Sequence, residues 1–174
     1  MTLKINTRLF SYSLLLLLLV CGSCIYSFTG TTLSPDIRTI SIQNLENSTG
    51  EGPSNLTQVV TDNMKDYYRR NTNLAIVQSE GDLQLAGQIV SFTYSPAAIQ
   101  REGQQDIASL NRLTLGVQIR FANVKQPEKD FERTFTIAQD FPQNVDVTQL
   151  STAQIEQLSE QLVVDVFNKT VADW

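Results

Sequence analysis

Histidine is absent from all 174 residues, which excludes Ser-His-Asp and Cys-His nucleophiles and the common zinc sites that use histidine. Cysteine is nearly absent, because only Cys21 and Cys24 occur, so neither a disulfide framework nor a Cys₄ metal site can form. Positive charge is also scarce: 13 Lys+Arg face 18 Asp+Glu, a net charge of −5, which argues against broad nucleic-acid binding. We therefore expect a protein that is not an enzyme, uses no metal or cofactor and has no nucleic-acid partner.

The N-terminus has the pattern of a secretory signal peptide. Lys4 and Arg8 give it a positive start, and residues 14–20 form an apolar run that is too short to cross a bilayer as a helix. We expect residues 1–23 to be cleaved. The alternative is a short membrane anchor that stays attached.

The end of the apolar run resembles a bacterial lipobox, in which a cysteine is lipidated and becomes the mature N-terminus. Cys24 follows Gly22 and Ser23, two small residues, whereas Cys21 follows the β-branched Val20. We therefore assign lipidation to Cys24, followed by a tether over residues 24–35. Ile25, in place of an aspartate, favours the outer membrane, with the domain facing the periplasm.

Removal of the signal peptide leaves a chain large enough to fold without a metal or disulfide. Losing the first 23 of 174 residues leaves 151, and losing Lys4 and Arg8 changes the net charge from −5 to −7. Neither an internal repeat nor a charge block divides this chain. We expect one domain over residues 36–174.

Hydrophobic periodicity predicts the elements of that domain. Period-2 segments predict strands, and three- and four-residue steps predict helices. The predicted strands cover 38–45, 74–77, 82–94, 112–121 and 131–137, and the predicted helices cover 54–71 and 151–173. We expect an α+β fold: a two-layer sandwich of a mostly antiparallel, four- to five-stranded sheet with two helices packed on one face.

Local signals add detail to these elements. Gly87 lies where the apolar phase of its strand shifts, which indicates a bulge or a close backbone approach. Asn55 or Ser54 is expected to cap the first helix, and Ser151 with Gln154 resembles a capping box for the second. Arg133 falls on the apolar face of its strand, as a buried ion-pair member or at a bulge.

Several short motifs together resemble the LptE family of lipopolysaccharide-assembly lipoproteins, in the form associated with Bacteroidetes-type bacteria. They cover essentially the whole mature chain in the family's order. The motifs are Cys24-Ile-Tyr-Ser-Phe-Thr-Gly, Ile37-Arg-Thr-Ile-Ser-Ile, Gly81-Asp-Leu-Gln-Leu-Ala-Gly, Leu110-Asn-Arg-Leu-Thr-Leu, Glu128-Lys-Asp-Phe-Glu and Phe167-Asn-Lys-Thr-Val-Ala-Asp-Trp.

The resemblance implies a role and a partner. LptE-type proteins are α/β sandwiches that sit in the periplasmic end of the outer-membrane barrel LptD, help it assemble and interact with lipopolysaccharide. The alternative is a periplasm-facing lipoprotein that binds a small hydrophobic or lipid ligand without a barrel partner.

Lipopolysaccharide carries phosphates and acyl chains, so arginines near apolar groups are its candidate ligands. Arg112 and Arg120 lie on the polar face of a predicted strand, and Arg101 lies in the long polar connection before it. Solubilising charge on an exposed sheet face is the other interpretation of these three residues.

Two further clusters have structural interpretations that we favour. The run of Glu128, Asp130 and Glu132 could perform acid–base chemistry or bind Ca²⁺, but the interleaved lysine and arginine favour a solvated strand end. An aromatic ligand patch is conceivable but more typical of a core, and its members are Tyr67, Tyr68, Phe92 and Tyr94.

Overall fold

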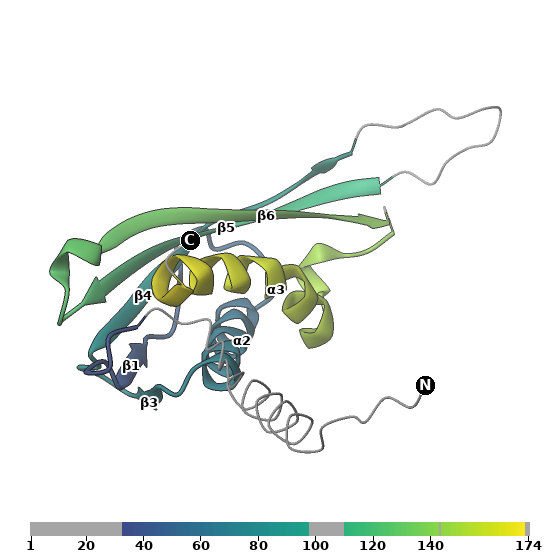
Figure 1. Cartoon of the computed structure of the whole chain (residues 1–174). Helices are drawn as coiled ribbons and strands as arrows, with labels where there is room; N and C mark the ends of the chain where they lie inside the picture. The colour runs from purple at the N-terminus through teal and green to yellow at the C-terminus, as the bar shows by residue number, and fades with distance from the viewer. Residues whose placement is uncertain (1–32, 98–109, 143, 173–174) are drawn as a thin grey trace, which may run out of the picture. The chain divides into compact units, whose positions relative to one another are not determined.

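The computed structural model describes residues 33–97, 110–142 and 144–172, all of which belong to one compact unit. Figure 1 shows its strands and helices. The strands are β1 (Thr39–Ile42), β2 (Glu46–Asn47), β3 (Ala75–Val77), β4 (Leu83–Pro96), β5 (Leu110–Asn123) and β6 (Phe131–Pro142). The main helices are α2 (Leu56–Asn71) and α3 (Thr152–Phe167), and the short ones are Pro127–Lys129, Val147–Gln149 and the π-helix Asn168–Ala172.

The strands form a single sheet in the order β3-β1-β4-β5-β6, and β2 also pairs with β4. This confirms the α+β class and the two-layer architecture, but the sheet is six-stranded and mixed. β1 is parallel to both β3 and β4, and β2 is parallel to β4, whereas β4, β5 and β6 are antiparallel. Parallel neighbours need a crossover connection, and α2 supplies it between β1 and β3.

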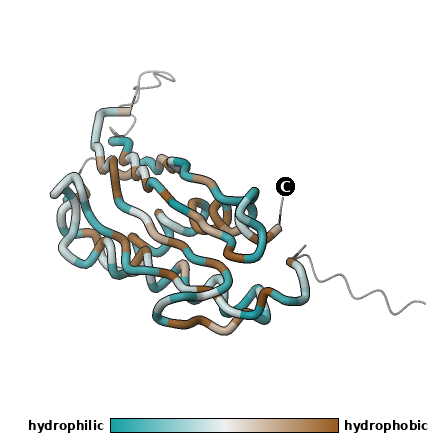
Figure 2. The backbone as a smooth tube through the Cα atoms, turned by 90° about the vertical axis from the view of Figure 1, so that its left-hand side faces the viewer, coloured by the Kyte–Doolittle hydropathy of each residue, from teal (hydrophilic) through white to brown (hydrophobic). Residues whose placement is uncertain are grey.

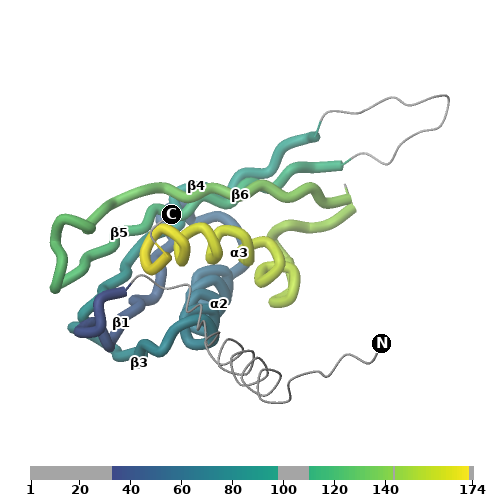
Figure 3. Tube along the Cα trace, viewed as in Figure 1, coloured from purple at the N-terminus to yellow at the C-terminus, as the bar shows by residue number. Residues whose placement is uncertain are grey.

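Both helices lie on the same side of the sheet, with α3 running beneath β6 in Figure 1 and the chain path visible in Figure 3. The core lies between the layers. Apolar and polar residues alternate along the long strands in Figure 2, and β4 and β5 each bury one face. On β5 the buried face consists of the predicted Leu113, Leu115, Val117, Ile119 and Phe121, each at most 2% exposed.

β4 has a close backbone approach at Gly87, and its phase changes at a bulge three residues later. At Gly87, an added Cβ would lie 2.5 Å from the backbone oxygen of Gln118, so the backbones approach closely there. The bulge follows at Val90, because Ile89 pairs with Val117 and Ser91 with Gly116. Leu85 and Ile89 therefore face the core on one side of the bulge and Phe92 on the other.

Arg133 is neither a buried ion-pair member nor located at a bulge, the two positions that the sequence suggested. The β5–β6 register runs without a shift from Leu110↔Pro142 to Phe121↔Phe131, so the strand has no bulge there. The Arg133 side chain is exposed, and its Cζ lies 5.6 Å from the centre of the Phe135 ring. Because β6 is an edge strand, this long side chain reaches solvent from the core-facing side.

Only one of the two predicted helix caps forms. The Ser151 Oγ accepts a hydrogen bond from the Gln154 N–H, and the Gln154 Oε1 accepts one from the Ser151 N–H, which completes the capping box. Asn55 is the N-cap of α2, but its side chain makes no capping hydrogen bond. No helix among the described residues is both long and apolar enough to cross a membrane.

Candidate functional site

The side of β4, β5 and β6 that points away from the helices is the candidate site, and we call it the outer sheet face. It is built mostly from hydroxyl, amide and small side chains, and within the described residues no helix covers it. Its members are Gln84, Ala86, Gln88, Ser91, Thr93, Ser95, Arg112, Thr114, Gly116, Gln118, Arg120, Ala122, Glu132, Thr134, Thr136, Ala138 and Asp140.

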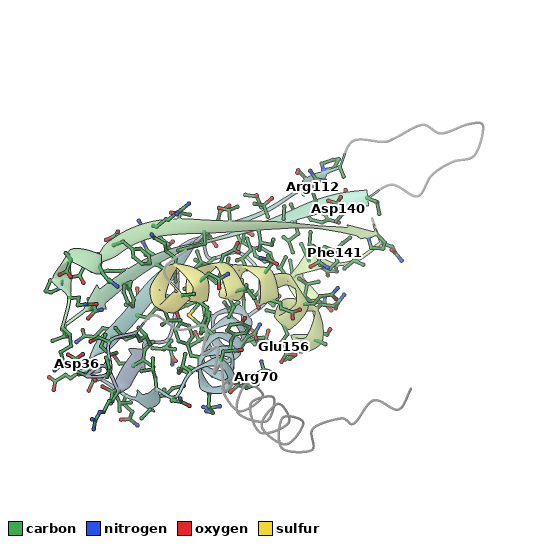
Figure 4. All side chains as sticks on the ribbon, in the orientation of Figure 1. Asp36, Arg70, Arg112, Asp140, Phe141 and Glu156 are labelled. Atoms are coloured by element: carbon green, nitrogen blue, oxygen red, sulfur yellow. The ribbon has the colours of Figure 1, made fainter. Side chains whose placement is uncertain are left out.

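Arg112 lies at one end of this face and forms a two-pronged ion pair across β5 and β6. Its Nε donates to Oδ1 of Asp140 at 2.7 Å and its Nη2 donates to Oδ2 at 2.9 Å. Figure 4 shows the two side chains next to each other. The hydrogen bonds from Arg112 lower the pKa of Asp140 and, reciprocally, raise that of Arg112.

Arg120 lies at the opposite end of the face and also pairs with a carboxylate, through one hydrogen bond from its Nε. Its Nε donates to Oε2 of Glu132 at 3.0 Å, and the two side chains are 73% and 45% exposed. The outer sheet face therefore carries two cations and two carboxylates, and its net charge is zero. The third predicted residue, Arg101, lies outside the described residues.

A surface pocket of about 240 Å³ opens at the Arg120 end of this face, and we call it the amide pocket. It is built from the β1–β2 connection, β2, β4 and β5, with one residue from β6. Its lining residues are Gln43, Asn44, Glu46, Ala86, Gly87, Gln88, Gln118, Arg120 and Glu132. Nothing in the sequence marks these residues as a group, because they are spread from Gln43 to Glu132 and come together only in the folded sheet.

A second hollow of about 770 Å³ lies between the exposed sides of α2 and α3, and we call it the helix groove. Its lining includes four carboxylates, Asp62, Asp66, Glu156 and Glu160, against a single cation, Arg70. Arg70 and Glu156 are visible on the helices in Figure 4. This side of the domain therefore repels anions, in contrast to the neutral outer sheet face.

Most of the other residues that the sequence suggested as functional have structural roles. Within the acidic run, Glu132 pairs with Arg120, and Asp130 Oδ1 accepts a hydrogen bond from the Asn123 N–H at 2.7 Å. No group of three or more metal-ligating side chains occurs among the described residues. Tyr68 and Phe92 are buried in the core, Tyr67 packs partly buried against it, and Tyr94 is 38% exposed. Cys24 lies outside the described residues.

Comparison with known protein families shows the family of this chain. The family model for LptE, described as lipopolysaccharide-assembly, matches residues 37–170, which include every described strand and both main helices. The chain belongs to the LptE family. Membership in this family implies a role in lipopolysaccharide assembly, and the family is not one of enzymes. No curated protein sequence matches the chain.

Some solved structures are similar to this LptE-family chain at low sequence identity. Protein XCC0632 from Xanthomonas campestris is 15% identical, with a TM-score of 0.52 over 78% of this chain and 87% of that one. Hypothetical protein CT253 from Chlamydia trachomatis is 8% identical, with a TM-score of 0.49 over 76% and 96%. A minor lipoprotein from Acinetobacter baumannii is 17% identical, with a TM-score of 0.41 over 78% and 96%.

Proposed function

We propose that this LptE-family protein is anchored in the outer membrane by a lipid on Cys24, faces the periplasm and partners an LptD-type β-barrel. In that complex it assists the transport and insertion of lipopolysaccharide. The observation that carries the proposal is the family match over residues 37–170. The apolar run of residues 14–20 followed by Gly22, Ser23 and Cys24 supports the lipid anchor.

The outer sheet face is the proposed contact surface for lipopolysaccharide. It is the face that the helices leave open, and Arg112 and Arg120 lie on it. Each guanidinium uses part of its five N–H donors on a carboxylate, so donors remain for a ligand. Arg101 belongs to the same proposal from its sequence position alone.

The alternative of a hydrophobic-ligand carrier has less support. The amide pocket and the helix groove are lined mainly by polar and charged side chains, unlike the apolar cavities that enclose small ligands. The space between sheet and helices is filled by buried side chains such as Ile40, Leu115 and Leu158, each at most 1% exposed.

Gentle detergent extraction of the tagged, lipidated chain from its native membrane tests the partner. Mass spectrometry should recover a large outer-membrane barrel in stoichiometric yield. The Cys24→Ala variant is the matched control for anchoring, and it should leave the membrane fraction. Recovery of the wild-type protein without a barrel contradicts the proposal, and co-purified lipid in its place would support the carrier.

A further inference from the structure

We propose that the amide pocket binds uncharged sugar residues through their hydroxyl groups, rather than phosphate. The inference rests on the proposed function, because lipopolysaccharide is the molecule that brings a glycan to this face. It assigns a chemical class of ligand to a pocket of about 240 Å³.

The hydrogen-bonding groups of the pocket suit a ligand rich in hydroxyls. Four side-chain amides line it, from Gln43, Asn44, Gln88 and Gln118. Each amide offers two donors and one acceptor, and a sugar hydroxyl both donates and accepts. The pocket is small and polar, whereas pockets for drug-like molecules are larger and mainly apolar, so it fits part of a polar ligand.

Two of the amides are held in place before any ligand arrives. The Gln88 Nε2 donates to the Gln118 Oε1 at 2.9 Å across β4 and β5, which leaves the Gln88 Oε1 and the Gln118 Nε2 for a ligand. Gly87, beside Gln88 in the lining, adds no side chain to the pocket. Fixed groups lose less freedom on binding, which favours recognition by hydrogen bonds.

The charges around the pocket argue against phosphate. Arg120 is its one lining cation and its charge is balanced by Glu132, while Glu46 adds a second carboxylate, so the lining carries a net charge of −1. Lys65 donates to the Asn44 Oδ1 at 3.0 Å, but it lines an adjacent hollow, which shares Gln43 and Asn44 with the amide pocket, and not the amide pocket itself. Phosphate sites instead gather several unpaired arginines or lysines.

Titration of the full chain in detergent micelles tests this chemistry, with the side-chain amide signals followed by NMR. The first probe is the delipidated, dephosphorylated core oligosaccharide of the producing bacterium's lipopolysaccharide, and the second is inorganic phosphate. We expect the oligosaccharide to shift the glutamine amide signals and phosphate to leave them in place. A maltooligosaccharide distinguishes a preference for the core from general glycan binding, and either supports the proposed class.

Variants locate the site. Gln118→Ala should weaken oligosaccharide binding about fivefold or more, the loss that one net hydrogen bond implies. Gln43→Ala is a second variant that removes a lining amide without disturbing the fold. The exposed Gln43 side chain makes no hydrogen bond among the described residues, so its loss leaves the sheet intact. Gln157→Ala, in the helix groove, is the matched control and should bind as wild type.

The outcomes separate this inference from the proposed function. Phosphate binding at the pocket, absence of any shift with the oligosaccharide, or equal losses in Gln157→Ala and Gln118→Ala would each overturn it. A chain that retains its barrel in the pull-down but ignores the oligosaccharide retains the function and loses the inference. A chain that binds the oligosaccharide but recovers no barrel in the pull-down retains the inference and loses the proposed function.

Discussion

Asp82 joins the start of β4 to the start of β1. Its Oδ2 accepts hydrogen bonds from the Arg38 and Thr39 N–H groups, both at 3.0 Å, and from the Thr39 Oγ1 at 2.9 Å. Its Oδ1 lies 3.6 Å from the Lys125 Nζ. The bond from the Arg38 N–H is the largest of several causes that lower the pKa of Asp82 to about 2. The charged carboxylate is therefore the form that the fold stabilises.

This lowered pKa predicts how stability depends on pH. The carboxylate's contribution is complete above its unfolded pKa of about 3.9 and is lost as the pH falls through about 2. Urea unfolding at pH 7 and at pH 3 should show a clear loss of stability in the wild type. Asp82→Asn should be less stable at pH 7, with a smaller change between the two pH values.

Asp62→Asn is the control for this experiment, since Asp62 is exposed on α2 and makes no hydrogen bond among the described residues. It should keep the wild-type pH dependence. Equal pH dependence of Asp82→Asn and the wild type would show that Asp82 does not provide this contribution.

Gly87→Ala should destabilise the fold by about 1–3 kcal/mol, the usual range for overpacking. The new Cβ would lie 2.5 Å from the Gln118 backbone oxygen, which cannot move without opening the β4–β5 pairing. Gly116→Ala is the control, because its Cβ would meet the Ser91 Cβ at 3.1 Å and requires only a small adjustment. Equal urea midpoints for the two variants would contradict the close approach.

At the scale of the element, the two main helices begin differently although both have cap-forming residues. Ser151→Ala removes a capping hydrogen bond and should cost about 1 kcal/mol of unfolding free energy. Asn55→Ala should cost only a few tenths, because the Asn55 side chain makes no capping bond. Urea denaturation measures both, and a larger loss for Asn55→Ala would contradict the difference between the caps.

The element patterns were predictable where a segment buries one regular face. β5 and both helices follow their hydrophobic periods, and the Ser151 capping box depends only on residues three apart. The position of Arg133 was not predictable, because its exposure depends on β6 lying at the sheet edge. Strand order comes from contacts between distant residues, and the period of a single strand carries no information about its neighbours.

At the scale of the whole molecule, Tyr68 links α2 to the C-terminal π-helix. Its hydroxyl hydrogen-bonds with the Thr170 Oγ1, 102 residues further along the chain, and the ring is fully buried. Burial raises the pKa of the Tyr68 phenol, so it stays protonated. The Tyr68 ring also meets Phe167 edge-on, with centroids 5.1 Å apart.

Tyr68→Phe should lower the free energy of unfolding by about 1 kcal/mol, since a buried hydrogen bond is lost while the ring remains. Tyr67→Phe is the matched control, because Tyr67 also packs on Phe167 but its hydroxyl makes no hydrogen bond among the described residues. Its stability should stay within about 0.5 kcal/mol of wild type in urea denaturation. Similar losses in both variants would assign the effect to the rings instead.

Local sequence patterns specify every strand except β2, both main helices and most of the faces that these elements bury, because these depend on side chains a few residues apart. It also predicted the polar positions of Arg112 and Arg120. Folding alone brings each arginine to a carboxylate, 28 and 12 residues away, and brings four amides into one pocket. Strand pairing is the reason, since a sheet brings together residues that lie far apart along the chain, and no local sequence pattern encodes which residues will meet.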